Sequence, residues 1–257
     1  MKRKITVLLL FILLTGASIS YGQQAGGQSG TTLALPKIGI NVGTSTNPGD
    51  VSVTLQLLLL LTVLSLAPSI MIMTTAYLRI IIVFHFLKTA LGTPQMPPSQ
   101  LIAGVALFLT FFIMAPTWSK VNDQALKPLM NGQISAEQAY DKGIQPVREF
   151  MFRNVRNEDL ELFLGLSNLN RPNDKNDVPT YVLIPAFVLS ELRAGFIIGF
   201  FLFIPFLMID MIVSSILMSM GMMMLPPTLV SIPFKILLFI LIDGWHLIVG
   251  SLVRSFS

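Results

Sequence analysis

The sequence predicts an all-α membrane protein whose hydrophobic helical hairpins carry a small charged helical insertion. Hydrophobic residues make up 53% of the 257 residues and charged residues only 12%, whereas soluble domains hold roughly 25% charged residues. Several hydrophobic runs also reach the ~20 residues that a helix needs to cross a bilayer. The formal charge of +4 comes from scattered basic residues, so the sequence does not indicate a nucleic-acid-binding protein.

Residues 1–22 are predicted to be a cleaved signal peptide, and residues 23–50 a flexible extracytoplasmic tail. Basic residues 2–4 precede an apolar run over residues 5–14, which is too short to span a bilayer. Cleavage is expected after Gly22, with a short uncleaved anchor as the alternative. The tail is rich in Gly, Gln, Ser, Thr and Asn, a composition that buries too little apolar surface to fold.

Residues 51–118 are predicted to form the first two hydrophobic helical segments. The first run has no charge before Arg79, which predicts one long or broken helix with a kink at Pro68. The proline-rich stretch 92–98 cannot be helical, because proline lacks an amide donor and restricts the residue before it. A second spanning helix is expected over residues 101–118.

Residues 119–177 are predicted to be a charged, water-facing helical region, because they hold eight basic and nine acidic residues, 17 of the 30 charges in the chain. Ser135 and Gln138 have the spacing of a capping box at a helix start. Apolar residues then recur at helical spacing around Pro146, and residues 170–175 are expected to form a loop.

Residues 178–257 are predicted to form a hydrophobic helical hairpin, a methionine loop and a C-terminal helix. The run over residues 178–225 holds few charges and is about twice as long as one span requires. A break in this run is therefore expected near Pro205. A final apolar helix is expected over residues 228–253, with its apolar run interrupted by Lys235 and Asp243.

Charged and small residues in the hydrophobic runs indicate where helices contact one another. An unpaired Lys or Asp at the centre of a spanning helix costs about 2.5–3.5 kcal/mol, so each charge there needs a partner or water. Glu191 and Arg193 lie on different faces of one helix, and Lys235 and Asp243 lie two turns apart, so neither pair can close within its own helix. We therefore expect Lys235 to meet Glu191 or Asp210 from another helix, either as a structural ion pair or as part of a proton relay. Gly195 and Gly199 form a GxxxG pattern that lets helices approach closely.

A cluster of methionines is the most specific local feature of the chain. Residues 218–227 read MSMGMMMLPP, with five methionines in seven residues. Methionine side chains are unbranched and polarizable, so a ring of them around an axis could seal a pore and deform around a passing polypeptide. The predicted seal residues are Met222, Met223 and Met224, with Gly221, Pro226 and Pro227 as the hinge and the stop of the loop. Core filling and a copper(I) thioether site are the alternatives.

The sequence does not indicate an enzyme, a metal site or a bound cofactor. The chain has no cysteine, which excludes thiolate ligands, a cysteine nucleophile and disulfides. His85 and His246 lie in separate apolar runs, and no HExxH, GxSxG or P-loop motif occurs. Asp210 and Asp243 leave open an intramembrane aspartyl protease, in which two carboxylates share a proton.

Four longer stretches carry a family resemblance: residues 91–100 (LGTPQMPPSQ), 148–160 (REFMFRNVRNEDL), 203–227 (FIPFLMIDMIVSSILMSMGMMMLPP) and 233–245 (PFKILLFILIDGW). Because these stretches follow one another in the family's order, the sequence resembles the FliP family of flagellar type III export-gate subunits. That family is related to the injectisome SctR family. The resemblance extends over about residues 53–256.

The resemblance implies a non-enzymatic role without a cofactor. A pentamer of the chain would assemble with FliQ and FliR into a closed helical pore that conducts unfolded flagellar proteins, with FlhB and FlhA nearby. The complex would lie in the bacterial inner membrane at the flagellar basal body, with its core raised toward the periplasm. The family's methionine loop falls on Met222, Met223 and Met224, and its polar contacts fall on Arg156, Glu191, Asp210 and Lys235.

The rival prediction is a small-solute or copper(I) transporter. In that case the methionines would be soft metal ligands and the buried acids would carry protons. A transporter would bind its metal as a lone protein, whereas an export-gate subunit would work only within a complex.

Overall fold

The computed structural model describes residues 48–93, 95–167, 174–222 and 225–256, with the side chains of residues 48–54 excepted. All regular elements in these ranges are helices, which confirms the predicted all-α fold class. The predicted signal peptide, residues 1–22, lies outside the described residues, as does the predicted tail apart from its last three positions. The contacts described below lie within residues 52–257, which form one compact unit.

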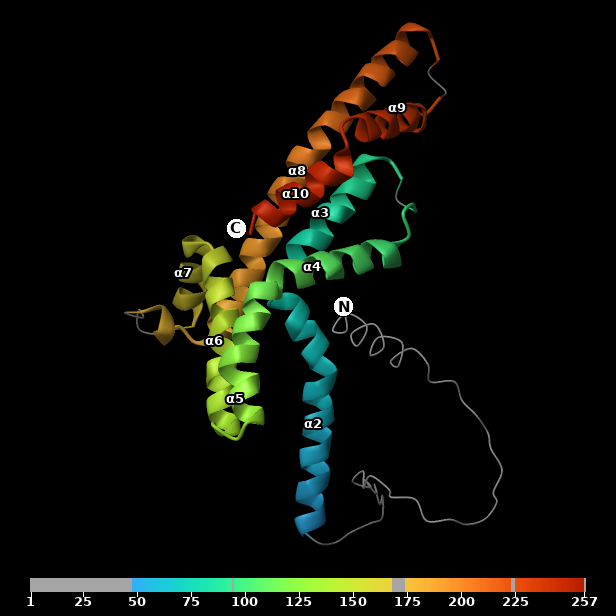
Figure 1. The fold of residues 1–257 in the computed structure, drawn as a ribbon. Helices are drawn as coiled ribbons and strands as arrows, with labels where there is room; N and C mark the ends of the chain where they lie inside the picture. Colours follow the sequence, from blue (N-terminus) through green and yellow to red (C-terminus); the bar gives the residue numbers. More distant parts are fainter. Residues whose placement is uncertain (1–47, 94, 168–173, 223–224, 257) are drawn as a thin grey trace, which may run out of the picture. The chain divides into compact units, whose positions relative to one another are not determined.

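The longer helices, in chain order, are α2 (Pro48–Met73), α3 (Tyr77–Ala90), α4 (Ser99–Val121), α6 (Ala136–Asn154), α7 (Asn157–Leu166), α8 (Thr180–Ser219), α9 (Pro227–Leu241) and α10 (Gly244–Arg254) (Figure 1). A π-helical turn η1 (Asn122–Leu126) and the short α5 (Lys127–Met130) continue α4, and a 3₁₀ turn η2 (Lys175–Asp177) precedes α8.

The first hydrophobic run is a broken helix, but the break does not lie at Pro68. α2 continues through Pro68 and ends at Met73. The hydroxyl of Thr74 donates to the carbonyl of Ile70 at 2.9 Å, and that of Thr75 to the carbonyl of Ile72 at 3.4 Å. Because these side chains bond to the last carbonyls of α2, they offer the backbone an alternative to continuing the helix.

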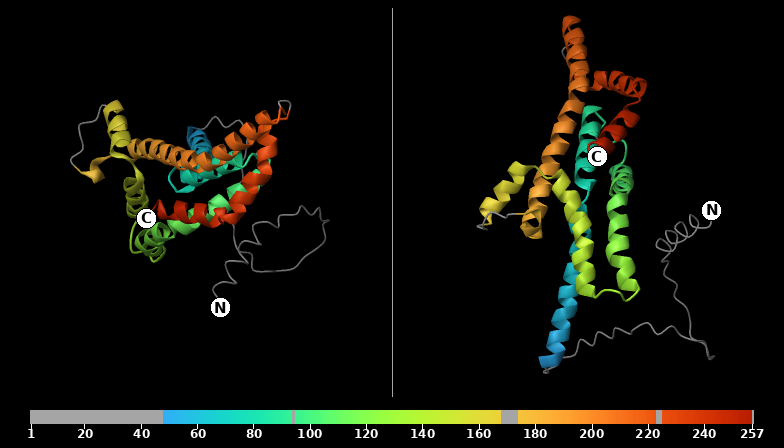
Figure 2. Two further views of the ribbon diagram at one scale, coloured as in Figure 1. Left: turned by 90° about the horizontal axis from the view of Figure 1, so that it is seen from above. Right: turned by 60° about the vertical axis from the view of Figure 1, so that its left-hand side comes forward.

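The predicted break near Pro205 is wrong. α8 runs without interruption over Thr180–Ser219, through both Pro185 and Pro205 (Figure 2). α3 packs along α8, where a Cβ added at Gly195 would lie 3.0 Å from Ile82. Neighbouring helices that pack this closely support a helix at a proline, where one backbone hydrogen bond is lost. The hairpin reverses instead after Ser219, at the methionine segment.

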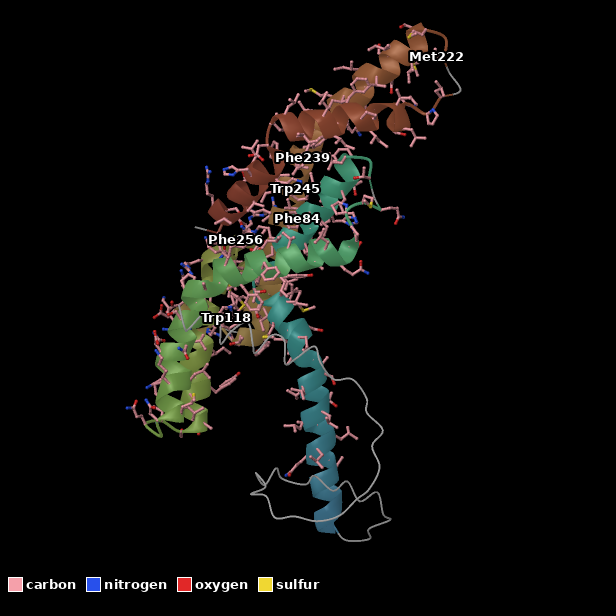
Figure 3. The ribbon with its side chains drawn as sticks, turned by 45° about the vertical axis from the view of Figure 1, so that its right-hand side comes forward. Phe84, Trp118, Met222, Phe239, Trp245 and Phe256 are labelled. Atoms are coloured by element: carbon pink, nitrogen blue, oxygen red, sulfur yellow. The ribbon has the colours of Figure 1, made fainter. Side chains whose placement is uncertain are left out.

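The C-terminal apolar run breaks at Asp243 and not at Lys235. α9 and α10 meet at an angle of 64°, and Asp243 adopts the left-handed conformation with φ 49° and ψ 55°. Gly244 follows, and a Cβ there would overlap the ring of Phe239. Trp245 then packs edge-on against both Phe239 and Phe84, at centroid distances of 5.5 and 6.2 Å (Figure 3). The break therefore folds α10 back onto α9 and α3.

The main core lies where α3, α4, α6, α8 and α10 meet. Its fully buried side chains include Phe84 of α3, Met114 of α4, Met151 of α6, Phe187 of α8 and Leu252 of α10. α6 begins at the capping box predicted for Ser135 and Gln138, which is confirmed. This core joins the charged region to the hydrophobic helices.

Much of the apolar helix surface remains exposed within the single chain. In the described residues, Leu55–Met73, Ser99–Met130 and Thr180–Ser219 are long and apolar enough to cross a membrane, and the bent pair α9 and α10 could form a fourth span. Apolar surface of this extent requires lipid or another protein to cover it. The helices therefore support localisation to a membrane.

The glycine contacts with α3 can be tested by substitution. Gly199→Ala should destabilise the protein by about 1–3 kcal/mol, because the added Cβ would overlap the ring of Phe86. The matched control is Gly104→Ala, where no atom lies within 4 Å and alanine should be neutral or stabilising as a better helix former. Thermal unfolding in detergent measures both. Equal unfolding midpoints for the two variants would contradict the close approach of α3 and α8.

Candidate functional site

A buried ion pair joins α3 to α8. Arg79 Nε donates to Glu191 Oε2 at 2.9 Å, and a second guanidinium nitrogen donates to Oε1. The two residues are only 5% and 0% exposed. A two-point bond of this kind holds both side chains in a fixed orientation and satisfies the buried carboxylate.

The same guanidinium also holds the C-terminal end of α10. Arg79 Nη1 donates to the carbonyl and to the hydroxyl of Ser255, at 2.8 and 3.0 Å. Its central carbon lies 3.8 Å from the ring centre of Phe256, a cation–π contact. The Phe256 ring stacks on Phe150 of α6 at 6.1 Å. Arg79 therefore ties together α3, α8 and the C-terminal end of the chain, which in turn packs on α6.

A second ion pair joins α8 to α9. Lys235 Nζ donates to Asp210 Oδ2 at 2.7 Å, and the Ser231 hydroxyl donates to the other carboxylate oxygen. Of the two acids expected to meet Lys235, the structure places Asp210 beside it, while Glu191 pairs with Arg79. The Asp210 carboxylate is thus bound by a cation and a hydroxyl, which differs from a protease dyad of two carboxylates.

Arg156 belongs to neither of these two ion pairs. Its guanidinium contacts Glu158 at 2.9 Å. Its backbone amide donates to the hydroxyl of Ser190, which donates to Asp159 Oδ2 at 2.7 Å. Arg156 Nη1 is buried and has no hydrogen-bond acceptor among the described residues. An unpaired buried donor of this kind is costly, so water or a group outside the described residues is expected to accept from this nitrogen.

Arg148 fixes the start of α8. It is buried, and it donates to the carbonyl of Val178 at 2.7 Å and to the hydroxyl of Thr180. Burial lowers the pKa of the Arg148 guanidinium from its ordinary value. Neither Arg148 nor Arg79 is among the site residues predicted from the sequence, although the cost of burying a charge applies to both.

The methionine segment lies at the end of the α8–α9 hairpin (Figure 3). Gly221 has φ 77°, and two backbone bonds close the end of α8: Met222 N–H to the carbonyl of Leu217 and Gly221 N–H to the carbonyl of Met218, both at 3.0 Å. This is a Schellman motif, in which glycine ends a helix. Met222 is 43% exposed, and Met223 and Met224 lie outside the described residues.

The two prolines begin α9 and do not stop α8. Pro226 is the N-cap residue of α9 and Pro227 its first residue, a favoured place for proline because the first amide of a helix has no acceptor. Gly221 already ends α8, so this glycine is a fixed cap where the sequence analysis expected a loosened hinge. Among the described residues, no group of three or more His, Asp or Glu side chains could hold a metal ion.

Comparison with known proteins gives one consistent result. The FliP family model matches residues 60–252. The flagellar biosynthetic protein FliP of Bacillus subtilis is 55% identical over 217 residues, covering 84% of this chain and 98% of that protein. The protein of the same name in Borreliella burgdorferi is 42% identical over 249 residues, covering 96% and 97%. In Caulobacter vibrioides it is 48% identical over 224 residues, covering 87% and 84%. The resemblance is therefore confirmed.

The buried ion pair should contribute far more to stability than an exposed one. Arg79→Gln leaves Glu191 buried without its cation, which should destabilise the protein by about 3–5 kcal/mol. Lys120→Gln is the control, because its ion pair with Glu149 is exposed and such pairs contribute about 0–1 kcal/mol. Thermal unfolding in detergent compares the two. A midpoint for Arg79→Gln that matches the control would show that the pair does not hold α3 to α8.

Proposed function

The chain belongs to the FliP family, and we propose that it is the pore-forming core subunit of the flagellar type III protein export gate. Its relatives are named flagellar biosynthetic proteins, which supports a role in flagellar export. The finer proposal is that several copies surround a path for unfolded flagellar proteins. The chain would act by assembling and sealing, and we assign no catalytic step to it.

The observation that carries this proposal is the exposed methionine turn at the end of a firmly held hairpin. α8 and α9 are joined by the Asp210–Lys235 ion pair, and the turn beyond them presents Met222 to the outside. A side chain that is exposed in one chain can meet its equivalents in other copies. Methionines brought together in this way would form a soft apolar constriction.

The Schellman motif at Gly221 fixes the backbone at the base of the proposed seal. The backbone at the end of α8 is held by two hydrogen bonds, so compliance would come from the thioether side chains. We propose that Met222, Met223 and Met224 together close the pore against ions. When a polypeptide enters, these side chains would change rotamers and pack around it, because methionine has three rotatable bonds and no hydrogen-bonding demand.

The polar residues of the site divide into two proposed roles. Glu191, Asp210 and Lys235 hold helices of one chain together, since their ion pairs close within the chain. Arg156 is the best candidate for a contact between subunits, because its buried Nη1 has no acceptor in the described residues. The GxxxG pair, Gly195 and Gly199, packs against α3 of the same chain, so it joins α8 to α3.

The proposed complex is a pentamer of this chain with FliQ and FliR, and with FlhB and FlhA nearby. It would lie in the bacterial inner membrane at the flagellar basal body, with its core raised toward the periplasm. The exposed apolar faces of the three candidate spans would be covered partly by these subunits and partly by lipid. The copper(I) transporter gains no support from the relatives, which are named for flagellar biosynthesis.

The seal can be tested in living cells. Replacing Met222, Met223 and Met224 together by alanine should leave assembly intact and let ions leak, because the shorter side chains cannot close the constriction. Membrane conductance, or growth in the presence of a small toxic ion, measures the leak. The control is Met130→Ala, since Met130 is exposed in α5, and α5 lies far from the end of the α8–α9 hairpin (Figure 1). A triple variant that neither leaks nor changes export would contradict the seal.

A further inference from the structure

Lys88 is a buried cation for which the described residues supply no carboxylate partner. Lys88, in the last turn of α3, is 7% exposed. Its ammonium makes one long hydrogen bond, to the hydroxyl of Ser99 at 3.4 Å. Among the described residues no carboxylate forms an ion pair with it, whereas Arg79 and Lys235 each have one. A buried ammonium requires a compensating charge, so Lys88 points to an anion that comes from elsewhere.

The start of α4 faces the same point. α4 begins at Ser99 without a side-chain cap, and it runs for 23 residues. The amides of Leu101 and Ile102 donate to the carbonyl of Pro98, while those of Ser99 and Gln100 meet no acceptor in the described part of the chain. Free amides and the positive end of the helix dipole favour an anion at this position. The Lys88 ammonium and the Ser99 hydroxyl would add two further donors.

The turn between the two helices keeps this arrangement in place. Gly92, with φ 73°, ends α3 in a second Schellman motif, in which the Thr93 amide donates to the carbonyl of Lys88 at 3.2 Å. A Cβ at Gly92 would lie 3.1 Å from Ile232 of α9. The turn is therefore packed against the hairpin, and the donors of α3 and α4 are positioned before any ligand arrives.

An apolar stripe on α4 begins at the same helix end. Exposed side chains recur at helical spacing along one face, and Phe108 is 72% exposed. The stripe consists of Leu101, Leu107, Phe108, Phe111 and Phe112. An anion-binding point at one end of an exposed apolar strip matches an amphiphile with a negative head and hydrocarbon tails.

We propose that Lys88 and the N-terminal end of α4 bind the phosphate of a membrane phospholipid, whose acyl chains lie along the α4 stripe. The lipid would supply the missing negative charge and cover apolar surface that the single chain leaves exposed. The α3–α4 turn would thereby be held at the level of the lipid headgroups. This inference depends on membrane localisation and does not require the methionine seal, so either proposal can fail alone.

The test is lipid binding by the protein in its complex, purified in mild detergent. After removal of native lipid, phosphatidylglycerol and a diacylglycerol with the same acyl chains are added separately, and native mass spectrometry counts the bound molecules. The wild type should retain phosphatidylglycerol in preference to diacylglycerol, which lacks the phosphate. Lys88→Met should weaken retention about tenfold, the effect of losing one charged hydrogen bond. Lys88→Arg should restore it.

The matched control is Lys120→Met, which removes an exposed lysine that pairs with Glu149 and should leave retention unchanged. Three results would overturn the proposal: equal retention of the two lipids by the wild type, unchanged retention by Lys88→Met, or zero-length coupling of Lys88 to a carboxylate of another polypeptide by carbodiimide. If Lys88→Met fails to assemble, the lipid comparison and the coupling reaction on the wild type still decide the question.

Discussion

The buried ion pair between Arg79 and Glu191 is the contact on which the hydrophobic part of the molecule depends. Helices surrounded by lipid or by other apolar subunits gain little hydrophobic free energy from meeting each other, so hydrogen bonds and close backbone packing determine how they associate. Arg79 bonds to Glu191 at two points and to the C-terminal Ser255 at two more. The Arg79 side chain thereby holds α3, α8 and the end of α10 together. It also contacts Phe256, whose ring stacks on Phe150 of α6.

This anchor leaves the far end of the α8–α9 hairpin free to carry the functional surface. The Asp210–Lys235 pair continues the connection along the hairpin, and Gly221 closes the end of α8 in a fixed geometry. The proposed seal thus combines a rigid support with flexible side chains. The α3–α4 turn is built in a similar way, because a fixed backbone there holds Lys88 and the free amides of α4 next to each other.

Hydropathy and capping signals predicted the helical fold, the exposed apolar runs and the start of α6, because these depend on local sequence. The breaks were harder to place. Pro205 lies inside a continuous helix, since α8 tolerates the lost hydrogen bond where other helices pack on it. The left-handed turn at Asp243 does have a local signal, because a charge in an apolar run is followed there by Gly244. Arg79 was missed because its partner lies 112 residues away. The proposed role of Arg156 in a contact between copies rests on its buried Nη1, which has no acceptor among the described residues.

The central claim is that the methionine turns of several copies meet around one axis, and the natural absence of cysteine allows a direct test. Met222→Cys in the assembled complex should form disulfide-linked dimers on mild oxidation, because a disulfide requires Cα atoms within roughly 7 Å of each other. Met130→Cys, exposed in α5, should remain monomeric. If an intact complex with Met222→Cys gives no more dimer than Met130→Cys, the turns do not converge and the proposed pore is wrong.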